Sequence, residues 1–344
     1  MHLASGHRAV FLSGEELEQQ RRAFQGFTTG LVRLSPGGWV LPGSYTKYAD
    51  RLYNFQFRSS DVLVMSYPKS GTTWTQEIVW TMRNNPDLTH PKTSTSINTR
   101  SPFLECDMLL EQGGRGEFIP KRLIDRLREL DPEAEPGRGI FLQIATATRD
   151  PRTIKTHLPL SLLTPRLLDT TKVVYVARNP KDVCASFCHY SRIIKGFNFV
   201  GTMDDFVQFL VEDKLIFGPY WEHLRETWLV RNHPNMHFLF YEDLKSDLMT
   251  ELNRLNTFLG TSLTAKQLQQ VAHHTSFSEM KAREETADIA SDIYHNMAVI
   301  KTDGGFFRKG DTGSWKTQLT AVQEEKIDQW TIVSNLDITF KYFL

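Results

Sequence analysis

The stretch Ser66-Tyr67-Pro68-Lys69-Ser70-Gly71-Thr72-Thr73-Trp74 joins an apolar run at residues 62–65 to a segment with apolar residues at Ile78 and Met82. The run predicts a buried strand, and the spacing of four residues predicts a helix. The first N–H groups of a helix lack partners and its dipole is positive at that end, so such a loop favours an anion. Lys69 adds a full positive charge. The sequence therefore predicts an anion site here, with an ordinary strand-to-helix turn as the alternative.

The order of residues in this loop separates it from the Walker A phosphate loop. In that motif the lysine directly follows the last glycine and lies at the start of the helix. Here Lys69 precedes Gly71, the only glycine of the loop, so the cation is expected on the strand side of the anion. The stretch from Tyr67 to Trp74 resembles the 5′-phosphosulfate loop of the cytosolic sulfotransferase family.

Composition limits the classes of function. Among 344 residues, 40 Lys and Arg balance 40 Asp and Glu, so no overall field favours a nucleic acid or an anionic membrane. The three cysteines lack CxxC spacing, which suits reduced thiols in the cytoplasm. No signal-peptide core or membrane-spanning run is evident, and no metal-ligand cluster appears. We expect a cytoplasmic protein without a metal, a nucleic-acid partner or a membrane span.

Short runs of β-forming residues alternate with segments of helical character along the chain. The runs lie at residues 62–65, 153–156, 173–177 and 237–241, and helices are expected at 75–82, 121–130, 179–190, 242–259 and 321–336. This alternation predicts an α/β fold with a central parallel sheet flanked by helices. Ligands of such sheets bind at the carboxyl ends of the strands. The resemblance implies the P-loop-kinase-like sulfotransferase fold.

We expect one domain over residues 1–344. Residues 1–60 are rich in glycine and aromatic side chains and are expected to form an irregular arm around the core. The segment 106–150 is charged and punctuated by glycine and proline, so an insertion or lid is expected there.

A second anion element follows the run at 173–177. Asn179 and Pro180 suit the N-cap and the first turn of a helix. Arg178 would then lie at the same sheet edge as Lys69, and Ser186 would add a hydroxyl. A surface arginine and a helix-face serine are the alternative. An arginine followed eight residues later by a serine resembles the site for the 3′-phosphate of the sulfate donor in the same family.

A basic, glycine-containing segment lies near the C-terminus, from Phe306 to Lys316. It resembles the Arg-Lys-Gly-x-x-Gly-x-Trp-Lys signature of the family, with Ser314 where aspartate is common; a basic surface turn is the alternative. Trp74 suits stacking on adenine. The resemblance implies that 3′-phosphoadenosine 5′-phosphosulfate, or its product 3′-phosphoadenosine 5′-phosphate (PAP), contacts Lys69, Ser70, Gly71, Thr72, Thr73, Trp74, Arg178, Ser186, Tyr241, Thr275, Phe277, Phe307, Arg308, Lys309 and Gly310.

The segment Lys155-Thr156-His157-Leu158-Pro159 lies at the end of another run. Residues two apart in a strand share a face, so Lys155 and His157 are expected to point into one pocket. A buried structural histidine is the alternative. The segment matches the catalytic segment of the family, which implies that His157 is the general base and that Lys69 and Lys155 stabilise the charge of the leaving group.

The acceptor side is less defined by the sequence. Phe103, Tyr190, Phe197 and Phe199 are candidates for its wall, which favours a small hydrophobic phenol, sterol, retinoid or similar alcohol. The chain also resembles the retinol dehydratase branch of the family, so a dehydratase acting through a sulfated allylic alcohol is the alternative function. The segment 316–325 resembles the dimer motif of the family, with Ala321 where that motif has valine. The resemblance implies a homodimer, and an ordinary helix start is the alternative.

Overall fold

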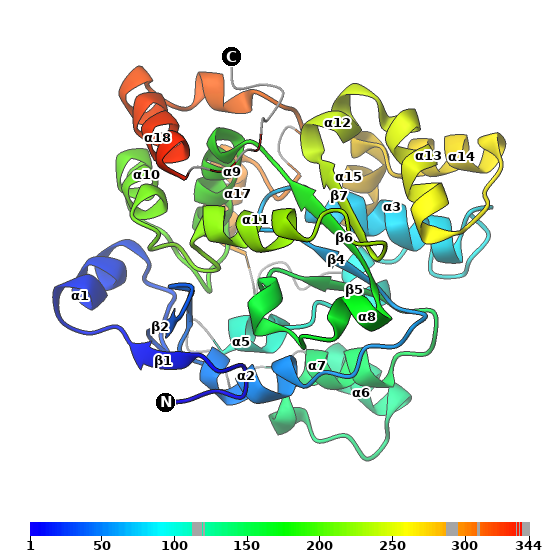
Figure 1. Ribbon diagram of the computed structural model, residues 1–344, viewed down its shortest axis with the longest axis horizontal. Helices are drawn as coiled ribbons and strands as arrows, with labels where there is room; N and C mark the ends of the chain where they lie inside the picture. Colours follow the sequence, from blue (N-terminus) through cyan, green and yellow to red (C-terminus); the bar gives the residue numbers. More distant parts are fainter. Residues whose placement is uncertain are drawn as a thin grey trace.

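The computed structural model describes residues 1–111, 119, 121–286, 295–307, 310–334, 336 and 338 (Figure 1). Its centre is a parallel sheet in the order β5-β4-β6-β7. The strands are β4 (Val62–Met65), β5 (Thr153–Thr156), β6 (Lys172–Ala177) and β7 (Met236–Phe240). Each strand coincides with a predicted run to within one residue. This arrangement confirms the predicted α/β fold.

Helices account for much of the rest of the described chain. The longer ones are α1 (Gly14–Ala23), α2 (Tyr45–Tyr53), α3 (Thr72–Asn84), α6 (Lys121–Leu130), α7 (Ile140–Ala147), α9 (Pro180–Ile193), α10 (Met203–Val211), α11 (Tyr220–Leu229), α13 (Leu248–Leu259), α14 (Ala265–His274), α15 (Phe277–Thr286), α17 (Met297–Asp303) and α18 (Ala321–Val333). The shorter ones are α4 (Ile97–Arg100), α5 (Cys106–Leu110), η1 (Pro136–Arg138), η2 (Leu160–Leu162), α8 (Leu167–Thr170), α12 (Tyr241–Ser246) and η3 (Ser314–Thr317).

Both faces of the sheet are buried, because successive side chains of a strand point to opposite sides. Leu63 and Val173 belong to one apolar cluster, which also contains residues of α9 and α11. Val64 and Val174 belong to a second cluster with residues of α3, α13 and α14. Burial on both faces explains why the two middle strands, β4 and most of β6, read as continuous apolar runs in the sequence.

Two helices begin directly after neighbouring strands at the same edge of the sheet. Gly71 precedes α3 with a left-handed φ of 104°. Asn179 caps α9, its side chain accepting the N–H of Lys181 at 2.9 Å, as predicted. Since β4 and β6 are adjacent and parallel, the positive ends of both helix dipoles face the same region.

The prediction of an irregular arm over residues 1–60 is wrong. This segment contains α1, α2 and a three-stranded antiparallel sheet of β1 (Arg8–Phe11), β2 (Leu31–Ser35) and β3 (Val40–Pro42). The glycines at 37 and 38 both have positive φ and form the turn between β2 and β3. The buried apolar residues of the segment belong to the main core cluster.

The single helix expected over residues 242–259 is also wrong. The structure has α12 and α13 instead, with a break at Asp247. The carboxylate of Asp247 accepts the N–H of Thr250 at 3.1 Å and so starts a new helix.

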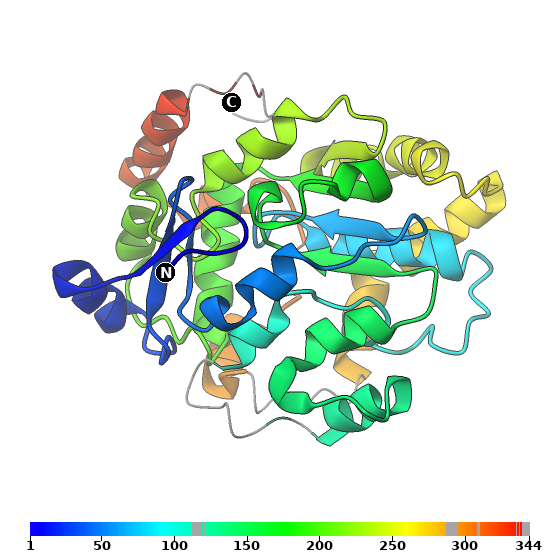
Figure 2. The ribbon, with the colours of Figure 1, turned by 60° about the horizontal axis from the view of Figure 1, so that its bottom comes forward.

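The segment 106–150 contains α5, α6, η1 and α7, and α6 has the predicted bounds. Leu127, Ile140 and Ile144 form a small apolar cluster of their own. In Figure 2 the α6–α7 pair lies at the lower edge of the view. The described part of this segment therefore packs as a layer of helices beside the central sheet and the helices that cover it.

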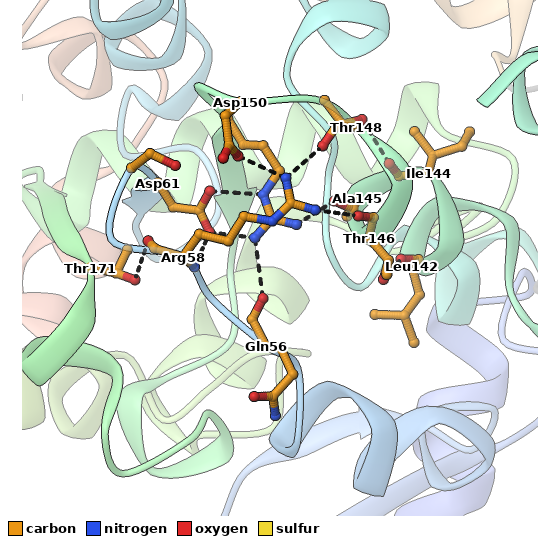
Figure 3. A network of polar contacts seen from close by, with 12 residues as sticks. Gln56, Arg58, Asp61, Leu142, Ile144, Ala145, Thr146, Thr148, Asp150 and Thr171 are labelled. Carbon is orange, nitrogen blue, oxygen red and sulfur yellow. Dashed lines mark hydrogen bonds and ion pairs between the residues drawn. The ribbon is translucent and has the colours of Figure 1, made fainter. Parts of the chain in front are cut away.

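Two arginines connect the C-terminal end of α7 by hydrogen bonds to the residues that precede β4 (Figure 3). Arg152 is 1% exposed and donates to both carboxylate oxygens of Asp61, at 2.7 and 2.5 Å. It also donates to the carbonyl of Ala145 at 2.8 Å, at the C-terminal end of α7. Arg58 donates to the carbonyl of Thr146 at 2.7 Å.

Candidate active site

A cavity of about 190 Å³ lies at the carboxyl ends of the central strands. This is the position in which parallel α/β sheets bind ligands. Many of the predicted site residues line it: Lys69, Gly71, Thr72, Thr73, Trp74, Phe103, Lys155, His157, Arg178, Ser186, Tyr190, Phe197, Tyr241, Phe277, Phe307 and Gly310.

Some predicted site residues lie elsewhere. Phe199 is only 3% exposed and packs against Phe24, with ring centres 4.8 Å apart, so its assignment to the acceptor wall is wrong. Ser70 is fully buried within the loop itself, and Thr275, the residue that follows α14, donates its hydroxyl to the carbonyl of Val271. Neither lines the cavity. Arg308 and Lys309, which were also predicted to contact the sulfate donor, lie outside the described residues.

The loop after β4 depends on glycine at one position. A Cβ on Gly71 would lie 2.4 Å from the ring atom Cδ2 of Tyr241, and its φ of 104° disfavours any other residue. Lys69 also has a positive φ, of 66°. The Lys69 ammonium lies 4.4 Å from the ring centre of Tyr190 and 4.0 Å from that of Phe306. The cation thus lies between the loop and the aromatic wall of the cavity.

Arg178 joins three parts of the site. Its guanidinium donates to the carbonyl of Lys69 at 3.2 Å and to that of Asp311 at 2.9 Å, and it stacks on Tyr241 at 4.3 Å. Asp182, one turn along α9, accepts the N–H of Gly313 at 2.7 Å. The C-terminal loop is thereby tied to the helix that follows β6. Sequence analysis missed Asp182, whose position beside the expected phosphate site was the available signal.

His157 has a defined tautomer. Its Nδ1 lies 2.8 Å from the carbonyl oxygen of Ser66, which can only accept, so Nδ1 carries the proton and Nε2 has the lone pair. Burial, with the nearby charge of Lys155, holds the pKa of the imidazole well below its usual value. The His157 imidazole is therefore neutral near pH 7, and burial also lowers the pKa of Lys155.

The backbone of His157 is held by two further buried groups, which the sequence did not reveal. His223 donates through Nε2 to the carbonyl of His157 at 3.0 Å, and its Nδ1 accepts the hydroxyl of Tyr175 at 2.8 Å. Glu105 accepts the N–H of His157 at 2.5 Å. Burial raises the pKa of Glu105 to about 7, while the hydrogen bonds from His157 and Thr156 act in the opposite direction.

The part of the cavity beyond His157 is mainly apolar. The rings of Phe103 and Phe217 lie edge-on to the imidazole, with centres 5.3 and 5.5 Å away. Leu109, Phe187 and His189 also line the cavity, and the sequence did not point to them. A compact, aromatic-lined chamber beside a neutral base suits a hydrophobic acceptor with one reactive polar group.

The other part of the cavity combines cations, hydroxyls and flat rings. Lys69, Lys155 and Arg178 line it together with Thr72 and Thr73. This set fits a nucleotide that carries charged groups at two positions. Within the described parts of the chain, no group of three or more His, Cys, Asp and Glu residues is placed to hold a metal ion. The helices described here include none long and apolar enough to cross a membrane.

Comparisons with known proteins agree with this geometry. The sulfotransferase domain family matches residues 59–337. The chain is 34% identical to sulfotransferase 1A1 of Rattus norvegicus, covering 85% of this chain and 90% of that protein. It is 31% identical to luciferin sulfotransferase of Photinus pyralis, covering 84% and 75%. A solved structure of retinol dehydratase in complex with androsterone and inactive cofactor PAP matches with a TM-score of 0.80 and 31% identity, covering 97% and 98%.

The match extends over most of the chain, and the solved relative was crystallised with PAP. We conclude that the chain belongs to the sulfotransferase family and is an enzyme that uses 3′-phosphoadenosine 5′-phosphosulfate as its sulfate donor.

Proposed function

We propose that this enzyme transfers a sulfuryl group to the hydroxyl of a small hydrophobic acceptor, with His157 as general base. The observation that carries the proposal is the bond from Nδ1 of His157 to the carbonyl of Ser66, at 2.8 Å. It leaves Nε2 as the proton acceptor on a buried, neutral imidazole that lines the cavity. The apolar wall beside it supports a phenol, sterol, retinoid or similar alcohol as acceptor.

Different residues carry out proton removal and charge stabilisation in the proposed reaction. Nε2 of His157 takes the proton of the acceptor hydroxyl as the acceptor oxygen attacks sulfur, in line with the bond that breaks. The S–O bond to the 5′-phosphate breaks, and its electrons go to the phosphate oxygen. Lys69, Lys155 and the N–H groups at the start of α3 stabilise that charge. A sulfuryl group carries less charge than a phosphoryl group, so the proposal requires no metal.

The donor is proposed to lie between the two helix starts. Trp74 and Phe277 would stack on the adenine, with Tyr241 at its edge. Arg178 and Ser186 would contact the 3′-phosphate, together with the segment 307–310. Support comes from the cavity, which most of these residues line, and from the hold of Arg178 on the carbonyl of Asp311.

A dehydratase is the second candidate function. The specific support is the likeness over 97% of the chain to a structure of retinol dehydratase in a complex with retinol and PAP. An allylic alcohol sulfated in this site would lose sulfate and a proton to give a dehydrated product. Sulfate release would then follow transfer, and the same residues would serve the first step.

Product analysis separates the two functions. Purified enzyme and the donor are incubated with a panel of phenols, sterols and retinoids, and each product is identified by mass spectrometry. Donor-dependent sulfate esters support the first function. A product lighter than its alcohol by one water, together with free sulfate, supports the second. Absence of both products across the panel contradicts the proposal.

We further propose a single domain, a cytoplasmic location and a homodimer through residues 316–325. Free cysteines and the resemblance to cytosolic enzymes support the location. Val322 lies in the dimer segment and is 67% exposed on α18, which supports a contact there. Sedimentation of the purified chain at micromolar concentration tests the homodimer, and a monomer alone would contradict it.

A further inference from the structure

Glu105 is a buried carboxylate that lies behind the base and does not line the cavity among the described residues. It is 1% exposed. Its Oε1 accepts the N–H of His157 at 2.5 Å, and its Oε2 accepts the hydroxyl of Thr156 at 2.8 Å. The same Thr156 oxygen accepts the N–H of Leu158 at 3.0 Å. One side chain therefore holds three consecutive residues around the imidazole.

The segment that carries Glu105 is itself bound to β5. The N–H of Lys155 donates to the carbonyl of Pro102 at 2.8 Å, and the N–H of Leu104 donates to the carbonyl of Lys155 at 2.9 Å. Phe103 pairs with Lys155 in a parallel bridge. Because β5 is an edge strand of the sheet, this segment extends the sheet at the point where the catalytic residues lie. The position of Glu105 relative to His157 is thus fixed by backbone hydrogen bonds.

We propose that Glu105 is a positioning residue that sets the location of the His157 imidazole for proton transfer. The inference rests on the proposed role of His157 as base. Among the described residues, the imidazole ring has one hydrogen bond, to the carbonyl of Ser66, so its direction also depends on where its own backbone lies. Glu105 fixes the N–H side of that backbone, and His223 fixes its carbonyl.

The alternative is that Glu105 only stabilises the fold. A matched carboxylate is available for comparison, because Asp107 lies in the same segment and is 4% exposed. It accepts the N–H groups of Phe141 and Leu142, at 3.1 and 2.9 Å, at the start of α7. Loss of that carboxylate would disturb the fold without touching the catalytic strand.

The test compares Glu105→Gln with Asp107→Asn in the full-length enzyme. The amide of Glu105→Gln keeps the shape but has one acceptor oxygen in place of two. If that oxygen still accepts the His157 N–H, the Thr156 hydroxyl loses its acceptor; if it accepts the hydroxyl, an N–H donor faces the His157 N–H. We expect single-turnover transfer at saturating donor to fall by roughly 10- to 100-fold, because small misplacements of a catalytic group cost about that much. PAP affinity, measured by calorimetry, should stay within about threefold, and Asp107→Asn should transfer at nearly the wild-type rate.

A series of phenols of increasing acidity shows whether Glu105 acts through His157. An acceptor that is already ionised needs no base. The fold-loss in transfer rate of His157→Ala relative to the wild type, called here the deficit, should therefore shrink along the series. We expect the deficit of Glu105→Gln to shrink in parallel, and the double variant to be no slower than His157→Ala alone. If Glu105→Gln does not fold, Glu105→Asp, which keeps the charge but is too short to reach both donors, should show the same pattern.

Two results would overturn the inference and are distinguishable. A constant deficit for the Glu105 variant, alongside a shrinking deficit for His157→Ala, would mean that Glu105 does not act through the base. A constant deficit for His157→Ala itself would reject the proposed base, and the positioning role with it.

Discussion

His157 and Arg178 show how much each side chain of the site depends on backbone groups. The His157 imidazole is oriented by the carbonyl of Ser66, and the Arg178 guanidinium by the carbonyls of Lys69 and Asp311. Carbonyls at strand and loop ends are fixed by the sheet, so they position side chains more rigidly than other side chains would. The positions of the His157 imidazole and the Arg178 guanidinium are therefore set by the backbone at the strand ends and in the loops that follow them.

His223 gives the fold a pH dependence that can be measured. Burial lowers the pKa of His223 to about 4, whereas the unfolded chain has the ordinary value of about 6.5. The unfolded state therefore binds more protons as the pH falls below about 6.5, and the free energy of unfolding should decrease between pH 6.5 and 4. Replacing His223 with glutamine removes this titration.

Urea unfolding at pH 7.5 and pH 5 measures the effect. Between these values, the wild-type enzyme should lose roughly 2 kcal/mol more of its free energy of unfolding than His223→Gln. Equal losses in the two proteins would show that His223 is not held neutral in the folded state.

The elements that make up the site are turns between a strand and a helix. In the turn after β4 the backbone passes so close to Tyr241 that only glycine fits at position 71. At the turn after β6, Asn179 caps the helix and Arg178 precedes the cap. The site is thus made where two parallel strands end and two helices begin, which is why separate sequence motifs converge there.

Gly71→Ala tests the role of the loop as an element. The added methyl would meet the Tyr241 ring. The alanine backbone would also have to keep an unfavourable φ, which costs about 1–3 kcal/mol of stability in the bound loop conformation. We expect PAP affinity, measured by calorimetry, to fall by at least about tenfold. Gly137→Ala is the control, since a Cβ at that position meets no atom within 4 Å. Unchanged PAP affinity in Gly71→Ala would mean that the loop does not bind the donor.

The sequence was informative where residue type determines local structure. The central strands are rich in β-forming residues, and β4 and most of β6 are apolar, so all four could be placed to within one residue. The strand β1 was missed because it pairs with β2 across the intervening helix α1, and the β2–β3 hairpin was missed although two glycines mark its turn. Phe199 was misassigned because the sequence does not show that it packs on Phe24. The role of Glu105 depends on a contact across 52 residues, which no local pattern reveals.

For the whole molecule, the arginine network of Figure 3 connects the helical layer 106–150 to the sheet domain. Arg152 and Asp61 form a fully buried ion pair. Arg152 also donates to the carbonyls of Ala145 and Gln56, and Asp61 also accepts the N–H of Arg58. The layer includes Leu109, which lines the cavity. The attachment of this layer therefore affects the shape of the acceptor part of the cavity as well as the stability of the protein.

Arg152→Met should destabilise the whole protein. Removing one partner of a buried pair leaves the Asp61 carboxylate uncompensated, and we expect the free energy of unfolding to fall by about 3–5 kcal/mol. The measurement is urea unfolding at pH 7.5. Arg166→Ala is the control, because Arg166 is 84% exposed and its contact with Asp169 is 3.9 Å long, so a change under about 0.5 kcal/mol is expected. Similar small losses in both variants would contradict a stabilising role for the network.

The most direct test of the account is single-turnover sulfate transfer by wild-type enzyme and His157→Ala, with PAP affinity measured on the same samples. Labelled donor is used at saturation, with a weakly acidic acceptor chosen from the panel. The account predicts that transfer falls by at least about 100-fold while PAP affinity changes by less than about threefold. Transfer near the wild-type rate, or a loss of PAP affinity as large as the loss of rate, would contradict it.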